Sequence, residues 1–262
     1  MSKEKVYVRE CSTRLMEICP TACDKYENIW AYDEQDGLWR KDSRMHLEQL
    51  IRKQILPSDK ISSHLVHEIL DDVKSLSFKY KEFPVAPPQR VSFADCVVDI
   101  ESGDVLEYDP KLYITAKLSV SYDPNGQCPL IEKIFSQLLP EDRVIDLYEI
   151  AAYCMFRSYP YQKFFFLYGR GANGKGVFAR VLEAILGKHN ISHVSMKNFQ
   201  NNRFSGAELY NKYANICTEL DYSDLNHTDL IKQLTGGDSI HAEKKFHHPF
   251  NFVGLPGLLC ID

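Results

Sequence analysis

A glycine-rich stretch, "GRGANGKG" at residues 169–176, has the residue types and the spacing of a phosphate-binding loop. Its outer glycines and Lys175 follow the pattern G-x-x-x-x-G-K, in which backbone N–H groups surround phosphate oxygens and the lysine reaches the β- and γ-phosphates. The next position normally carries a Ser or Thr hydroxyl that binds magnesium, and here it is Gly176. The stretch therefore indicates a nucleoside triphosphate site that lacks one magnesium ligand.

The loop needs a buried strand before it and a helix after it, because the helix N-terminus attracts anions. The apolar run "KFFFLY" predicts the strand, and "VFARVLEAILG" predicts a helix that ends at Gly187. An ordinary glycine turn between a core strand and a core helix is the alternative, but this order of elements favours a phosphate site. The expected nucleotide-binding residues are Gly169, Gly171, Ala172, Asn173, Gly174, Lys175 and Gly176.

Acidic side chains follow a second apolar run, in "YANICTELDYSD". In P-loop hydrolases an acidic residue at the end of a neighbouring strand holds magnesium or polarises the attacking water. Glu219 and Asp221 are the catalytic candidates on this basis, and Glu219 is the expected magnesium ligand. An exposed acidic turn after a strand would explain Asp221 equally well, so we favour Glu219.

The run "HAEKKFHH", residues 241–248, places cations around the aromatic ring of Phe246. Such cations can follow the phosphates of a single nucleic-acid strand while the ring offers a stacking surface. Gly236 and Gly237 permit a tight turn shortly before this run. A solvated basic turn is the alternative explanation.

Composition limits the class of protein. With 262 residues and 44% hydrophobic content, the chain can bury a sizeable core in one or two domains. A net charge of −5 means that any nucleic-acid contact has to be local. The eight cysteines include no C-x-x-C pair, the N-terminus is not a signal peptide, and no apolar run approaches the about 20 residues of a membrane span. We expect a cytoplasmic protein with reduced thiols and no membrane segment.

Hydrophobic periodicity divides the rest of the chain into short elements. An aromatic-rich hairpin is predicted at residues 26–40, with Gly37 as its left-handed residue. Helices are predicted in residues 44–56, 62–76, 128–139 and 141–156, and short strands with turns in residues 91–110 and 113–126. We place a boundary near residue 138, between an α+β domain at 1–138 and a phosphate-loop α/β domain at 139–262.

Four passages resemble the superfamily 3 helicases, specifically the poxvirus-type and phage or plasmid primase-helicase branch. "CVVDIESGDVLEYDPKLYIT" is similar to the strand and turn that precede the family's ATPase core, and "GRGANGKG" to its G-x-G-x-N-G-K loop, including Asn173. "ICTELD" is similar to the end of its acidic strand, and "LIKQLTGGDSIHAEKKFHHPFNF" to its motif between the acidic strand and the sensor strand. The likeness extends over nearly the whole chain from Trp30 onward.

The resemblance implies an α/β fold with an AAA+-like P-loop NTPase core, preceded by a smaller α+β domain. It implies an ATP- and Mg²⁺-dependent translocase on single-stranded DNA, usually a hexameric ring and often fused to or partnered with a primase. It also implies that the basic run forms a hairpin in the channel of the ring. The expected DNA-binding residues are Lys244, Lys245, Phe246 and His247.

The sequence departs from this family in places that bear on catalysis. Gly176 lacks the magnesium-binding hydroxyl, although a water backed by Glu219 could take its place because magnesium often keeps several waters. The final run "PFNFVGLPGLLCID" contains no sensor Asn at its end, no finger Arg follows it, and nothing before residue 26 is long enough for a primase. We therefore expect a truncated core that binds ATP and hydrolyses it slowly or not at all.

Other functions stay open beside the leading interpretation of a helicase-type ATPase segment from a viral, phage or plasmid replication protein. One is a non-catalytic remnant or adaptor that keeps the nucleotide-binding fold. Another is a small-molecule P-loop kinase, which we disfavour because no Arg-rich lid follows Glu219.

Overall fold

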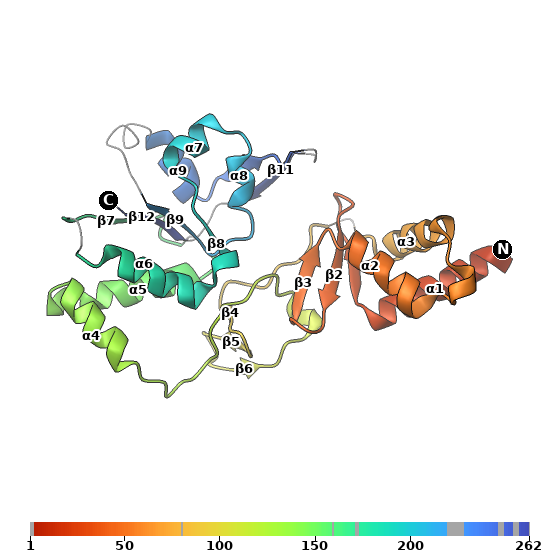
Figure 1. The fold of residues 1–262 in the computed structure, drawn as a ribbon, viewed down its shortest axis with the longest axis horizontal. Helices are drawn as coiled ribbons and strands as arrows, with labels where there is room; N and C mark the ends of the chain where they lie inside the picture. The colour runs from red at the N-terminus through yellow and green to blue at the C-terminus, as the bar shows by residue number, and fades with distance from the viewer. Residues whose placement is uncertain are drawn as a thin grey trace. The chain divides into compact units, whose positions relative to one another are not determined.

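The computed structural model describes residues 3–79, 81–158, 160–170, 173–218, 228–245, 249–253 and 257–261 (Figure 1). The chain forms two compact units. The first contains residues 1–87 and 108–115, and the second contains residues 88–107 and 116–262. The boundary near residue 138 stays a prediction.

The first unit combines three α-helices with a small antiparallel sheet of order β1-β2-β3. Its elements are α1 (Lys3–Ile18), β1 (Thr21–Cys23), β2 (Ile29–Asp33), β3 (Leu38–Lys41), α2 (Arg44–Leu50), a π-helical turn (Ile51–Ile55), 3₁₀ turns (Ser58–Lys60 and Pro110–Leu112) and α3 (Ser63–Ser77). The predicted hairpin is confirmed, and Gly37 has a φ of 71°. The predicted helix pair is confirmed as well. The sequence analysis did not anticipate α1.

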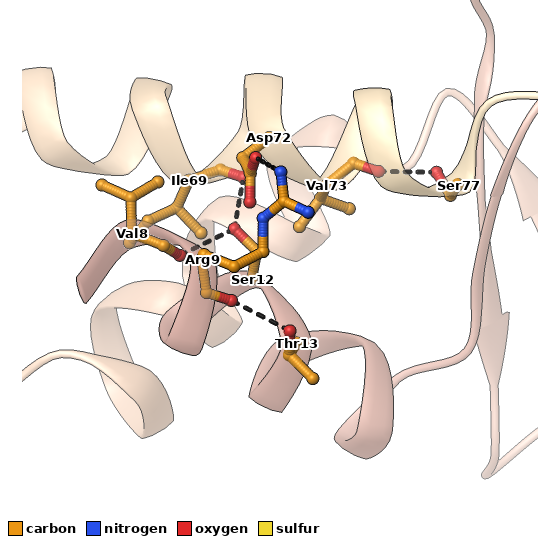
Figure 2. Close-up of polar contacts among 8 residues, drawn as sticks. All are labelled: Val8, Arg9, Ser12, Thr13, Ile69, Asp72, Val73 and Ser77. Atoms are coloured by element: carbon orange, nitrogen blue, oxygen red, sulfur yellow. Dashed lines mark hydrogen bonds and ion pairs between the residues drawn. The ribbon is translucent and has the colours of Figure 1, made fainter. Parts of the chain in front are cut away.

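Helices α1 and α3 are joined by polar contacts as well as by a hydrophobic core (Figure 2). The buried Ser12 hydroxyl lies 2.9 Å from the Val8 carbonyl of its own helix and 3.3 Å from the Ile69 carbonyl of α3. At the edge of the contact, Arg9 and Asp72 form an ion pair at 2.9 Å. The buried Ser12 hydroxyl therefore lies within hydrogen-bond distance of two carbonyl oxygens. A buried polar group requires such partners.

The second unit contains a parallel sheet of order β7-β12-β9-β8 and two smaller antiparallel sheets, which makes its fold α/β. Its elements are β4 (Arg90–Ser92), β5 (Val97–Asp99), β6 (Val105–Leu106), α4 (Pro129–Leu138), a 3₁₀ turn (Glu141–Arg143), α5 (Val144–Met155), β7 (Phe165–Leu167), α6 (Lys175–Leu186), a 3₁₀ turn (Lys188–Asn190), β8 (Ile191–Ser192), α7 (Met196–Asn201), α8 (Ser205–Glu208), β9 (Ala214–Thr218), α9 (Thr228–Thr235), β10 (Ser239–Ala242), β11 (Phe250–Val253) and β12 (Gly257–Ile261).

The parallel sheet lies between two layers (Figure 1). On one face, Ile216 of β9 and Leu259 of β12 pack with buried side chains of α5 and α6. On the other face, Cys217 and Cys260 pack with buried residues of α7, α9 and β10. Successive residues of a strand point to opposite faces, so these near-continuous apolar strands suit a sheet that is covered on both sides.

The strands predicted in residues 113–126 are absent, although every residue of this segment is described. Leu118 N–H donates to the Ser92 carbonyl at 2.8 Å, but Ser119 N–H donates to the Ile185 carbonyl at the end of α6. Because neighbouring residues bond to different elements, no ladder forms and the segment is irregular. The prediction of strands in residues 113–126 is therefore wrong.

None of the eight cysteines forms a disulfide, and no helix in the described part of the chain is long and apolar enough to cross a membrane.

Cys154 of α5 is fully buried, and burial raises the pKa of its thiol to about 12. Its thiolate forms in the unfolded chain above about pH 9 but is suppressed in the fold, so the unfolded state binds fewer protons there.

We therefore expect stability to fall as the pH rises from about 9 towards 12. Between pH 8 and pH 10 the Cys154 contribution lowers the melting temperature by roughly 3–5 °C. The measurement is thermal unfolding at both pH values for the wild type and Cys154→Ala. The variant should lose less on going to pH 10, and an equal loss in both proteins would contradict the assignment to Cys154.

Candidate functional site

Three parallel strands of the second unit end at the same level. Ile261 at the end of β12 pairs with Leu167 of β7 on one side and with Thr218 of β9 on the other. In open α/β sheets, ligands bind beyond the carboxyl ends of the strands, where connections leave in different directions. The glycine loop follows β7 at this edge, and residue 219 follows β9 there.

The predicted strand before the glycine stretch and the predicted helix after it are confirmed. Gly174 caps α6 with a φ of 91°, and its carbonyl accepts hydrogen bonds from the N–H groups of Val177 and Phe178. A Cβ at this position would lie 2.1 Å from Leu138 Cδ2, and a Cβ at Gly169 would lie 2.3 Å from Asn173 Nδ2. Both glycines thus allow close packing within and around the loop. Gly171 and Ala172 lie outside the described residues.

Lys175 is held by oxygens of the loop. Its Nζ donates to the Gly169 carbonyl at 2.5 Å, to Asn173 Oδ1 at 3.1 Å and to the Arg170 carbonyl at 3.3 Å. Because the ammonium bonds to residues on both sides of the loop, its positive charge stays at the N-terminus of α6. These contacts use the three ammonium donors in the free loop, so a phosphate at the helix N-terminus would bind by replacing loop oxygens on Lys175.

Gly176 is the first-turn position of α6 where the family loop has a hydroxyl. A Cβ there would meet nothing closer than Arg180 Nη1, at 3.8 Å. The absence of a side chain is therefore not forced by packing, and serine would fit without strain.

The acidic candidates Glu219 and Asp221 lie outside the described residues. Thr218, the residue before Glu219, ends β9 at the carboxyl edge as the sequence predicts. Among the described residues, no group of three or more His, Cys, Asp or Glu side chains could hold a metal ion. A magnesium site would thus depend on the residues after β9 and on the nucleotide itself.

The structure places a histidine beside the parallel sheet that the sequence analysis missed. His193 directly follows β8, its Nδ1 lies 3.0 Å from the Ile216 carbonyl, and its Nε2 lies 3.7 Å from Glu183 of α6. Asn215 of β9 also bonds to the segment after β8, because its Oδ1 accepts a hydrogen bond from the Val194 N–H at 2.8 Å. A strand of two residues is too short to be recognised by periodicity, which hid this position.

The hairpin implied by the resemblance is present. Strands β10 and β11 pair from Ser239–Val253 to Ala242–Phe250. The basic run begins with the last two residues of β10, and Glu243, Lys244 and Lys245 follow that strand. Lys244 and Lys245 are exposed, whereas Phe246 and His247 lie outside the described residues. Gly236 and Gly237 form the turn between α9 and β10, before the hairpin.

Comparisons with known proteins find two partial family matches. Residues 14–140 match the family described as "D5 N terminal like", and residues 167–260 match a "Family of unknown function (DUF5906)". The second match runs from the end of β7 into β12, so it includes the loop and the hairpin. A search of the curated proteins finds no match.

The chain is similar in structure to "The apo structure of NrS-1 C terminal region (305-718)", with a TM-score of 0.59 and 13% identity. This match covers 100% of the chain and 57% of the NrS-1 chain. "The A form apo structure of NrS-1 C terminal region-CTR" gives a TM-score of 0.58 and 15% identity over 95% of this chain and 54% of that one. The present chain thus spans little more than half of these relatives.

At such identities the likeness shows the fold alone. The match to the family described as "D5 N terminal like" covers somewhat less than half of the chain, and the second family has no described function.

Proposed function

We propose that the chain is the ATP-binding segment of a primase-helicase in viral, phage or plasmid DNA replication. It binds Mg-ATP at residues 169–176 and single-stranded DNA at the β10–β11 hairpin, within a P-loop core of the superfamily 3 helicase type. The observation that carries this proposal is the position of Lys175, whose ammonium is held by the loop oxygens beside the carboxyl edge of a parallel sheet.

The strand order supports a P-loop core. Strand β12 separates β7, which feeds the loop, from β9, which precedes Glu219. The glycine loop and the segment that begins with Glu219 therefore follow strands that lie on either side of β12. The resemblance assigns the sensor strand to the run that contains β12, which agrees with this central place.

The loop has the groups that bind the phosphates of ATP, but it lacks the side-chain oxygen that usually binds magnesium. Its glycines bring the backbone close, and Lys175 supplies the charge for the β- and γ-phosphates. Magnesium, when bound, neutralises charge on those phosphates. Glu219 would hold it directly or through water, with Asp221 as the second candidate, because Gly176 offers no ligand.

The proposal also includes the assembly in which the chain acts. A hexameric ring around single-stranded DNA and a primase as partner follow from the resemblance, and a cytoplasmic location follows from the cysteine usage and the absence of a signal peptide or membrane run in the sequence. This chain spans 57% of the NrS-1 C-terminal region, so these properties of a whole protein stay part of the proposal.

A non-catalytic adaptor that retains the nucleotide-binding fold is the second candidate function. Gly176 favours it, because packing would admit a serine that the chain does not have. ATP binding without turnover distinguishes the adaptor from the translocase, and binding itself tests both against an ordinary glycine turn.

The test of the proposed function is calorimetry with ATP, ADP and AMP, each with magnesium. We expect affinity to decrease in that order, because the loop contacts the terminal phosphates. Equal affinity for ATP and AMP, or no binding at millimolar ATP, would contradict a phosphate-binding loop.

Gly176→Ser should tighten magnesium-dependent ATP binding by about five-fold, since one added metal ligand contributes on the order of 1 kcal/mol. Gly176→Ala is the matched control, because it adds the same Cβ in the same open space without the hydroxyl. The two variants should differ with magnesium and agree in EDTA. Equal binding by both variants with magnesium would contradict the account of the missing hydroxyl.

A further inference from the structure

Arg203 lies beside the start of the basic hairpin turn, although it belongs to the connection between α7 and α8. Its Nε is 3.5 Å from Oε2 of Glu243, which follows β10 and directly precedes Lys244. The Arg203 side chain is 73% exposed and that of Glu243 is 28% exposed. A third cation, 41 positions before Lys244 in the sequence, therefore faces solvent next to the lysine turn.

The backbone that carries this arginine is fixed in place. Asn202 Oδ1 accepts a hydrogen bond from the Phe204 N–H at 3.0 Å, and the Asn202 carbonyl accepts one from the Ser205 N–H at 3.0 Å. Gly206 lies so close to β10 that a Cβ would be 3.3 Å from the His241 carbonyl. The segment is thus packed against the hairpin, and its cation is held near the turn before any ligand arrives.

The guanidinium is supported on one side and open for binding on the other. Its Cζ lies 4.8 Å from the centroid of the Phe204 ring, a cation–π contact. The ion pair with Glu243 is made through Nε, and 73% of the arginine side chain is exposed to solvent. Paired guanidinium donors match the oxygens of a phosphate, so Arg203 has the geometry of a phosphate contact.

We propose that Arg203 binds a backbone phosphate of the same single strand that the hairpin lysines bind, and that Glu243 competes with this phosphate for the guanidinium. This inference rests on the proposed function, because the hairpin itself must bind the strand. Glu243 holds the guanidinium while the site is empty. Exchange for a phosphate costs little, because an exposed ion pair contributes little to stability.

The test compares Arg203→Ala, Glu243→Gln and Lys188→Ala by fluorescence anisotropy with labelled oligothymidine between 50 and 200 mM salt. Arg203→Ala should weaken binding about 8-fold at 50 mM salt and lower the log-affinity versus log-salt slope by about 0.7. Glu243→Gln should tighten binding about two-fold, because it removes a competing carboxylate. Lys188→Ala removes an exposed cation beyond the far end of α6 and should change neither quantity.

The opposite signs for the two partners distinguish the inference from a structural ion pair. If the pair only stabilised the hairpin, both variants would weaken binding and lower the melting temperature together, which would overturn the inference. Arg203→Lys keeps the charge and should keep the salt slope.

A result in which Lys244→Ala with Lys245→Ala flattens the slope, but Arg203→Ala does not, overturns this inference and leaves the hairpin site standing. No change in any of these variants overturns the DNA site as well.

Discussion

Replacing Lys175 with alanine is expected to weaken Mg-ATP binding by roughly 100-fold, because charge-assisted hydrogen bonds to a phosphate contribute about 1.5–3 kcal/mol. In the free protein the ammonium bonds to Gly169, Arg170 and Asn173. The variant therefore loses both the cation and the contacts that hold the two sides of the loop together. Isothermal titration calorimetry of the two proteins measures the difference.

Lys188→Ala is the matched control for this experiment. Lys188 is an exposed lysine that follows α6, whereas Lys175 is the first residue of that helix. Its loss changes the net charge equally and should leave ATP affinity unaltered. Equal affinity of wild type and Lys175→Ala, with an unchanged circular dichroism spectrum, would show that the loop does not bind phosphate.

The double variant Lys244→Ala with Lys245→Ala is expected to weaken binding of single-stranded DNA on the order of 50-fold at 50 mM salt. Each phosphate contact contributes about 0.7 to the log-affinity versus log-salt slope, so the slope should fall by about 1.4. Sequence preference should barely change, because phosphates carry no base information. Anisotropy with labelled oligonucleotides at several salt concentrations measures both quantities.

A solvated basic turn predicts a different result, in which affinity and slope stay at the wild-type values. Lys188→Ala again controls for the loss of charge. Because the proposed channel forms only in a ring, analytical ultracentrifugation of the same samples has to accompany the titration. A variant that matches the wild type in oligomeric state and in salt slope would contradict the hairpin site.

The elements that the sequence predicted well are those that local rules define. The strand before the loop, the helix after it and the stop at Gly187 depend on residues close together in the chain, and all three are confirmed. The strands expected in 113–126 failed, since strand formation requires a partner in register and this segment has none. The place of β12 between β7 and β9 depends on pairing over long separations, which periodicity does not report.

The candidate site likewise has features that local sequence rules predict and features that depend on the folded chain. Lys175 and the loop glycines follow from spacing alone, whereas their contacts with Asn173 and Leu138 depend on the folded turn. Nothing in the sequence connects Arg203 with Glu243, because α8, β9, α9 and β10 lie between them. Residues 219–227, which include Glu219 and Asp221, lie outside the described residues, so their roles stay predictions.

Strand β12 is the last of the parallel strands to be synthesised, yet it lies inside the sheet. Within the described sheet it is the only partner of β7, so a nascent chain that stops before residue 257 leaves the strand of the glycine loop unpaired. The half-built sheet exposes apolar strand edges, which are prone to pair with other chains. We therefore expect ribosome-bound intermediates of this protein to need chaperone protection and to acquire nucleotide affinity only after β12 has left the exit tunnel.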